Sequence, residues 1–134
     1  MTFALDTNTL SYYMRQEGRV AARFQAQPPH RLALPSVVVY ELNHGLRRVG
    51  RRSALDALSK LVRTIAVIDF DLEAADHAAR IRVELEARGT PISGADLLIA
   101  ATARRHGCTL VTHNTREFER VPGLRVEDWL VAQN

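Results

Sequence analysis

The chain has 134 residues, of which 46% are apolar and 25% are charged, and its formal net charge at pH 7 is +3. This length suits one domain with its own core, and the composition is that of a soluble globular protein. No apolar run approaches the roughly 18–20 residues of a membrane-spanning helix, and no secretory signal follows Met1. The single cysteine, Cys108, excludes an internal disulfide and a metal site built from cysteines. We therefore expect one cytoplasmic domain over residues 1–134.

Arginine supplies almost all of the positive charge, and Lys60 is the only lysine. Arginine makes planar, bidentate contacts with phosphate, but an arginine-rich genome composition would give the same count. The densest cluster of positive charge is open to two interpretations, a solvated helix end or a surface that faces phosphate or a protein partner. Its members are Arg47, Arg48, Arg51 and Arg52.

The spacing of apolar residues predicts that strands alternate with helices along the chain. In chain order we expect a strand at 2–7, helices at 9–18 and 19–27, a strand at 31–34, helices at 35–50 and 53–65, a strand at 66–70, helices at 71–89 and 92–107, and strands at 108–112 and 124–129. This alternation predicts an α/β domain with a mostly parallel, buried sheet. Ligands of such sheets bind beyond the carboxyl ends of the strands, so polar residues there are candidates for one shared site.

The first strand runs directly into Asp6, Thr7 and Asn8. These residue types are common at helix N-termini, where their side chains accept hydrogen bonds from free backbone N–H groups. At the carboxyl edge of a parallel sheet the same carboxylate would also face a ligand site. Asp6 is therefore either a helix cap or a site residue.

Two further acids, Glu41 and Asp96, stand in apolar surroundings. Glu41 shares a face of its expected helix with Val37 and Val38, where a carboxylate is costly unless it is paired, bound to a metal or turned toward water. Asp96 is the only charged residue in "SGADLLIAATA", and with Ser93 it resembles a capping box. A capping role and a role in a ligand site are both open, and one residue can fill both.

The segment "LVTHNTREF" supplies the fourth candidate, Asn114, which follows a strand ending at Thr112, with Glu117 close behind. Acids that share a cleft repel one another, and a divalent cation relieves that repulsion. Carboxylate and amide oxygens are ligands typical of Mg²⁺ or Mn²⁺ rather than of zinc. Such an ion activates water and neutralises charge on a phosphodiester. The pattern therefore favours a Mg²⁺ site at the edge of the sheet.

Four motifs in this order resemble those of PIN-domain proteins and, more narrowly, of the VapC-type toxins of bacterial toxin–antitoxin pairs: "LDTN", "PSVVVYELNHG", "PISGADLLIAATA" and "LVTHNTREFERVPGLRVEDW". The resemblance covers essentially the whole chain. It implies a PIN-like α/β/α sandwich with a mostly parallel central sheet of four to five strands. It also implies a Mg²⁺-dependent endoribonuclease, with Mn²⁺ as a substitute, that forms a homodimer and a larger assembly with an inhibitory, VapB-like antitoxin.

Carried over residue by residue, the resemblance gives roles to the candidate acids. Asp6 and Asp96 would hold the metal, while Glu41 would bind it directly or through water, or would help to deprotonate the attacking water. Asn114 stands where many PIN domains have a fourth aspartate, and this departure weakens any claim to a second metal site. Small polar residues would support these groups by hydrogen bonds. They are Thr7, Asn8, Ser36 and Thr112.

The motif "TREFERVPGL" also resembles the branch of this family whose members cut transfer RNA, the initiator in particular. The anticodon loop would suit as the target because its bases are already exposed. Attack by metal-activated water would leave 5′-phosphate and 3′-hydroxyl ends, and arginines near the cleft would steer the RNA backbone.

The helices expected at 35–50 and 53–65 carry many apolar residues, in a number that can exceed what one small core buries. Two interpretations are open: an antitoxin helix docks here, as in related toxins, or these side chains pack on the sheet and on each other. The residues are Val38, Leu42, Leu46, Leu55, Leu58, Leu61 and Val62.

Three alternatives fit the sequence less well. A haloacid-dehalogenase-like phosphatase needs a second acid two residues after the first, and Asn8 stands there. A phosphoryl-accepting receiver domain needs a lysine after a late strand, and Lys60 lies inside an expected helix. The third alternative is a catalytically silent PIN-like module that binds RNA or protein. The clustered acids argue against it, because uncompensated like charges destabilise a fold.

Overall fold

A five-stranded sheet, in which every strand pair is parallel, forms the centre of the computed structural model, which describes residues 1–131. The spatial order of the strands is β3-β2-β1-β4-β5. Their bounds are β1 Phe3–Leu5, β2 Leu32–Pro35, β3 Ala66–Ile68, β4 Thr109–Val111 and β5 Val126–Glu127. In register, Phe3 of β1 lies between Leu32 of β2 and Thr109 of β4.

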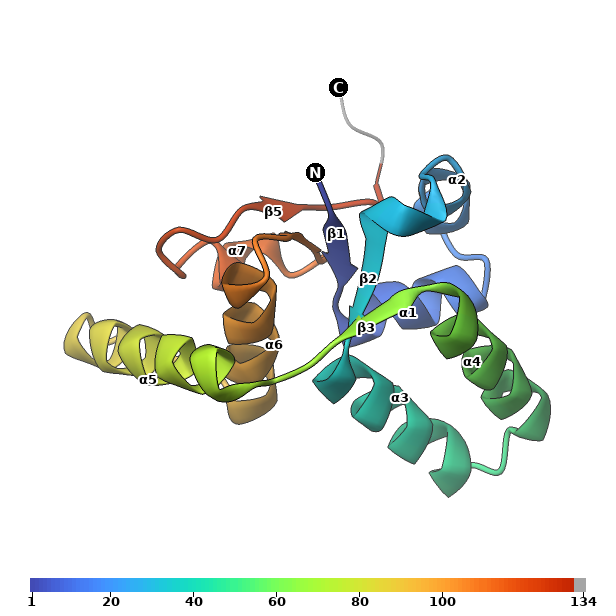
Figure 1. The fold of residues 1–134 in the computed structure, drawn as a ribbon, viewed down its shortest axis with the longest axis horizontal. Helices are drawn as coiled ribbons and strands as arrows, with labels where there is room; N and C mark the ends of the chain where they lie inside the picture. The colour runs from blue at the N-terminus through green and yellow to red at the C-terminus, as the bar shows by residue number, and fades with distance from the viewer. Residues whose placement is uncertain (132–134) are drawn as a thin grey trace.

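Helices connect the strands and flank the sheet (Figure 1). They are α1 Thr7–Met14, α2 Val20–Gln25, α3 Ser36–Arg48, α4 Arg52–Thr64, α5 Leu72–Ala87, α6 Gly94–Arg105 and α7 Thr115–Phe118, with a 3₁₀ turn η1 at Pro29–Arg31. Helix α5 packs along α6, α3 packs against α4, and α1 packs against α2. The expected α/β/α fold with a four- to five-stranded sheet is confirmed, at the upper strand number. Within residues 1–131, no helix is long and apolar enough to cross a membrane.

The middle of the sheet and α6 form the deepest part of the core. Leu5, Leu34 and Leu110 on neighbouring strands are fully buried, as the unbroken apolar runs of a parallel sheet predict. Helix α6 buries Leu97 and the whole stretch from Ile99 to Ala103. An amphipathic surface helix would expose one face, so the all-round apolar pattern of this helix is explained by its burial.

Several boundaries differ from the prediction. Helix α1 begins at Thr7 rather than at residue 9, because the Asp6 side chain caps it. The strand expected at 66–70 ends at Ile68, and the last strand is limited to Val126–Glu127. Helix α7 was not predicted, because four residues are too few to show helical periodicity.

The carboxyl ends of the strands meet at one edge, where α1 and α3 begin (Figure 1). From β1 the chain moves outward through β2 and β3, and it returns on the other side of β1 with β4 and β5. The switch point of this topology lies between β1 and β4, which is where open parallel sheets bind their ligands. Any site of this fold is therefore expected beyond Leu5 and Val111.

Candidate active site

Asp6 leaves the end of β1 and is almost completely buried, with 6% of its surface exposed. Its Oδ1 accepts a hydrogen bond from the Thr9 backbone N–H at 2.9 Å, and its own N–H donates to the Val111 carbonyl at 3.0 Å. Burial raises the pKa of the Asp6 carboxyl, while hydrogen bonds from the Thr112 and Thr9 side chains act against that increase. Both interpretations of Asp6 therefore hold together: it caps α1, and it lies at the switch point of the sheet.

Asp96 lies in the first turn of α6, whose N-cap is Ser93. Burial raises the pKa of its carboxyl to about 6, and a hydrogen bond with the Ser93 side chain opposes this increase. The negative charges of Glu117 and Asp6 raise this pKa further. Asp96, Glu117 and Asp6 therefore lie close enough to repel one another, although they come from three separate segments.

Asn114 and Glu117 form a hydrogen-bonded pair at the start of α7. Asn114 Nδ2 donates to Glu117 Oε2 at 2.6 Å, and the Asn114 backbone N–H donates to Thr112 Oγ1 at 3.0 Å. Glu117 has no assigned role in the sequence interpretation, yet it is the acid whose charge acts most strongly on Asp96. The sequence does show an acid three residues after Asn114. Only the helical turn of α7, however, reveals that its side chain meets Asn114.

Glu41 is brought to the same edge by α3. Its Oε1 accepts a hydrogen bond from Thr7 Oγ1 at 2.6 Å, so α3 is tied to the residue that follows Asp6. Thr7 therefore supports one of the candidate acids by a hydrogen bond, and that acid is Glu41. The hydrogen bond from Thr7, at the start of α1, therefore holds Glu41 at the acidic edge of the sheet.

The other expected supporting residues behave differently from one another. Thr112 is fully buried and contacts both Asp6 and Asn114. Ser36 Oγ accepts from the Phe70 backbone N–H at 3.4 Å, which ties the segment after β3 to the start of α3. Asn8 is exposed, and no hydrogen bond joins it to an acid within residues 1–131. The structure thus brings Thr112 to the acids, whereas Ser36 and Asn8 serve elsewhere.

Asp128, just after β5, adds a further acid that the sequence did not indicate. Its Oδ2 lies 2.9 Å from His113 Nδ1, and its Oδ1 accepts from the Leu130 backbone N–H at 2.8 Å. Its negative charge contributes to the raised pKa of Asp6. His113 and Asp128 therefore form a rim beside the buried acids.

The donor atoms at this edge are carboxylate and amide oxygens, which suit a hard divalent cation. Burial raises the pKa of Asp96 most, and repulsion from Glu117 and Asp6 adds to it; a bound cation would relieve that repulsion. Within residues 1–131, no three His, Cys, Asp or Glu side chains already stand in a metal-holding arrangement. The residues fit such an ion in chemistry and location.

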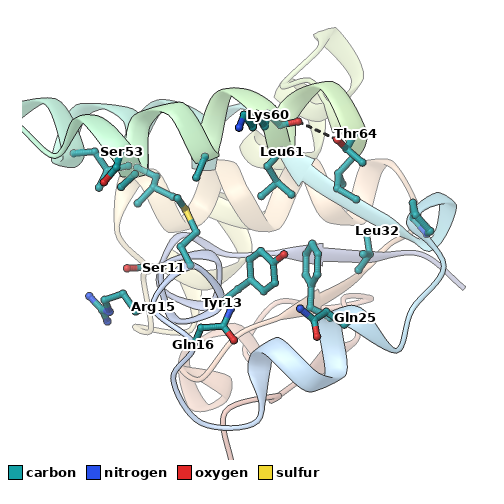
Figure 2. Close-up of a pocket in the computed structure, with 18 of the residues that line it drawn as sticks. Ser11, Tyr13, Arg15, Gln16, Gln25, Leu32, Ser53, Lys60, Leu61 and Thr64 are labelled. Atoms are coloured by element: carbon teal, nitrogen blue, oxygen red, sulfur yellow. Dashed lines mark hydrogen bonds between the residues drawn. The ribbon is translucent and has the colours of Figure 1, made fainter.

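A separate cavity of about 850 Å³ lies on another side of α3, among α1, α2 and α4 (Figure 2). The rings of Tyr13 and Phe24 stack in it with centroids 3.9 Å apart. Apolar side chains and a basic rim line it, including Leu42, Leu46, Leu61, Arg15, Arg51 and Lys60. Val38 and Leu58 pack in the core, whereas Leu42, Leu46 and Leu61 line this cavity. Packing within the fold therefore accounts for part of the apolar surplus, and docking of an antitoxin helix stays a prediction.

The chain is similar to known proteins over nearly its whole length. The model of the PIN domain family matches residues 3–124. The "tRNA(fMet)-specific endonuclease VapC" of Shigella flexneri is 39% identical over 132 residues, which cover 96% of this chain and 98% of that protein. The protein of the same name from Salmonella typhimurium is 35% identical, with the same coverage.

Solved structures agree with this similarity. A DNA-bound VapBC complex from Salmonella typhimurium superposes with a TM-score of 0.88 at 35% identity, covering 96% of this chain and 98% of that one. A VapBC2 complex from Rickettsia felis, bound to a promoter DNA fragment, gives a TM-score of 0.86 at 29% identity, covering 96% and 99%. The chain belongs to the PIN-domain family and, within it, to the VapC ribonucleases.

Proposed function

We propose that this chain is the toxin of a type II toxin–antitoxin pair, a metal-dependent endoribonuclease that a cognate antitoxin neutralises. The observation that carries the proposal is the approach of Asp6, Asp96 and Glu117 at the carboxyl edge of a parallel sheet. Two relatives are named for cleavage of tRNA(fMet), and we propose initiator transfer RNA, cut in its anticodon loop, as the substrate here. The protein would act in the cytoplasm as a single PIN domain over residues 1–134.

Nucleases with this domain generally depend on a divalent metal ion, and we propose Mg²⁺, with Mn²⁺ as a substitute. Asp6 and Asp96 would hold it directly, and Glu117 would add an oxygen from α7. Glu41 would reach it directly or through water. When bound, the ion would neutralise the acids, polarise the phosphodiester and lower the pKa of a coordinated water.

The side chains of this protein would position the groups that react. Thr7 holds Oε1 of Glu41 at 2.6 Å, so Oε2 is the atom that would take the proton from the attacking water. Asn114 fixes Glu117 through its amide. Water that attacks the phosphorus in line displaces the 3′-oxygen, and the products would carry 5′-phosphate and 3′-hydroxyl ends.

The cavity beside α3 would receive an amphipathic helix of a VapB-like antitoxin. Its apolar floor suits the buried face of such a helix, and the rim of Arg15, Arg51 and Lys60 suits acidic side chains. Homodimer formation, and a larger assembly with the antitoxin, complete the proposal. On α5, Leu72 and Val83 are 87% and 68% exposed and lie three turns apart on one face, as residues that a second copy covers would.

Cleavage of a total transfer-RNA pool tests the proposed activity. Antitoxin-free protein is incubated with Mg²⁺, with EDTA, and as the Asp6→Asn and Asp96→Asn variants, and the cut ends are mapped. We expect discrete cuts with 5′-phosphate ends that disappear with EDTA and in both variants. Cuts that persist in both variants would refute the proposed roles of these two carboxylates.

The absence of a preformed three-ligand arrangement within residues 1–131 favours one second candidate, a silent PIN-like module that binds RNA or protein. The same experiment separates the two candidates. A folded, Mg²⁺-loaded protein that binds transfer RNA and leaves it intact, and that also leaves ribosomal RNA intact, would be such a module.

A further inference from the structure

Helix α3 presents a third face, which neither the acids nor the cavity uses. Tyr40, His44 and Arg47 follow one another at intervals of four and three residues, so they share one side of the helix. Leu42 and Leu46 point the opposite way and line the cavity. The third face is therefore turned away from the cavity.

Tyr40 is 68% exposed, although it is a large aromatic residue. Its ring stacks on His44, with centroids 6.4 Å apart and an angle of 19° between the planes. An exposed pair of nearly parallel rings offers flat surface on which a nucleic-acid base can stack. Tyr40 and Glu41 are consecutive residues of α3, and Glu41 bonds Thr7, so this flat surface and the proposed active site are carried by the same helix turn.

The arginines at and just beyond the end of α3 are not neutralised by acids. Within residues 1–131, the cluster Arg47, Arg48, Arg51 and Arg52 makes no ion pair, and Arg47 donates to the neutral Asn43 amide instead. On α5, by contrast, three arginines each have an acid four residues away. The pairs are Arg80–Asp76 at 3.0 Å, Arg82–Glu86 at 3.3 Å and Arg88–Glu84 at 2.7 Å. The end of α3 therefore carries a local excess of positive charge that α5 lacks.

We propose that this face, called here the α3 platform and made of Tyr40, His44, Arg47 and Arg48, binds an unpaired segment of the RNA substrate beside the bond that is cut. This inference rests on the function proposed above. An unpaired base stacks on Tyr40, and the guanidinium groups of Arg47 and Arg48 contact the phosphates on either side of it. The combination of an exposed aromatic ring with arginines that have no acidic partner favours RNA, because the negative charge of RNA phosphates would neutralise these arginines.

Binding to a fluorescent anticodon stem–loop of initiator transfer RNA, measured by anisotropy in EDTA, tests the platform without metal-dependent cleavage. Tyr40→Ala should weaken binding roughly tenfold, and Tyr40→Phe should keep it. The double variant Arg47→Gln/Arg48→Gln should weaken binding and should reduce the slope of log Kd against log salt by about 0.7 for each lost phosphate contact. The matched control, Arg82→Gln/Arg88→Gln, removes the same charge from α5 and should bind like the wild type.

Three results would overturn the inference. In the first, Tyr40→Ala binds as tightly as the wild type. In the second, both double variants weaken binding equally, which would indicate a general charge effect. In the third, Tyr40→Ala turns a dimer into a monomer in sedimentation while each chain still binds RNA, which would make the face a protein interface. If the wild type cleaves RNA and the platform variants bind RNA as tightly as the wild type, only the platform is refuted. If the wild type neither binds nor cleaves RNA, the proposed function is refuted as well.

Discussion

Asp6 and Asp96 each stand where the two roles that the sequence presents as alternatives are compatible. Asp6 caps α1 through the Thr9 N–H, and Asp96 lies in the first turn of α6. A helix N-terminus at the carboxyl edge of a sheet points its first residues toward the switch point, so an acid there can serve the helix and the proposed site together. The sequence could name both residues because each interrupts an apolar stretch, which is a strong local signal.

Asp96→Asn should stabilise the metal-free protein at neutral pH while it abolishes cleavage. The folded state raises the pKa of Asp96 from 3.8 to about 6, so this group favours folding only when protonated. Its contribution is complete below pH 4 and is lost as the pH rises through about 6. After allowance for solvent screening, we expect the variant to be about 1–2 kcal/mol more stable than the wild type at pH 7.5, with the difference closing toward pH 4.

Urea unfolding in EDTA at pH 4 and pH 7.5 measures this difference. Asp56→Asn, which removes an exposed carboxylate from α4, is the matched control and should change little at either pH. An advantage of Asp96→Asn that is the same at both pH values, or no advantage at pH 7.5, would contradict the raised pKa that burial and the neighbouring acids give Asp96.

Thr7→Val should lower kcat about tenfold and leave KM nearly unchanged. The substitution removes the hydroxyl that holds Glu41 Oε1, so the carboxylate would lose its position without losing its charge. Thr7→Ser keeps the hydroxyl and should restore the rate. Single-turnover cleavage of transfer RNA provides the measurement, and a Val variant as fast as Ser would rule out this role for Thr7.

The long helices could be predicted from the sequence, whereas the short helix α7 could not. Helices α3 to α6 have 12 to 16 residues and show their apolar period clearly. Helix α7 has four residues, too few for a period to appear, which explains why Glu117 was missed. Asp128 lies just after β5, inside the strand expected at 124–129, where no local signal marks it as a site residue. The partner of Thr7 was also hidden, because a contact across 34 positions depends on tertiary packing.

Helix α3 contributes to the acidic edge, to the cavity and to the α3 platform. Its face at the cavity can be tested separately from the other two. Ala57→Asp on α4 places a charge in the cavity that Leu42 and Leu46 line. We expect at least a tenfold weaker affinity for the antitoxin, because the carboxylate must be desolvated against an apolar helix. Cleavage without antitoxin should be unchanged.

Calorimetric titration with the cognate antitoxin measures this affinity. The matched control is Ser59→Asp, which places the same charge on α4 at an exposed position that does not line the cavity and should bind the antitoxin like the wild type. Equal affinities of the Ala57 variant and the wild type would show that the antitoxin docks elsewhere.

In the whole molecule, the position of the site follows from strand order. Asp6 leaves β1, Thr112 leaves β4, and these two strands flank the point where the chain changes direction across the sheet. A parallel sheet collects the carboxyl ends of its strands at one edge, so residues far apart in sequence meet there. This rule made the edge predictable from alternating elements alone, while the individual hydrogen bonds depended on side-chain packing.

The weak point of this sheet is its outer strand, and Trp129 holds it in place. Strand β5 has two residues, but Trp129 just beyond it is 1% exposed, packs edge-on against Phe3 of β1 at 5.1 Å, and donates from Nε1 to Glu127 at 3.1 Å. Trp129→Ala should therefore destabilise the fold by about 3–5 kcal/mol, since it leaves a large cavity and removes the hydrogen bond to Glu127. Trp129→Phe should lose distinctly less.

Far-UV circular dichroism in urea measures both variants, because the chain has no other tryptophan to report by fluorescence. Tyr40→Ala removes an exposed aromatic ring instead, and it should stay within about 0.5 kcal/mol of the wild type. Because Asp128 precedes Trp129 and pairs with His113 beside the acids, release of β5 should also slow cleavage before the rest of the chain unfolds. A Trp129→Ala protein that loses under about 1 kcal/mol and cleaves normally would show that β5 does not need this anchor.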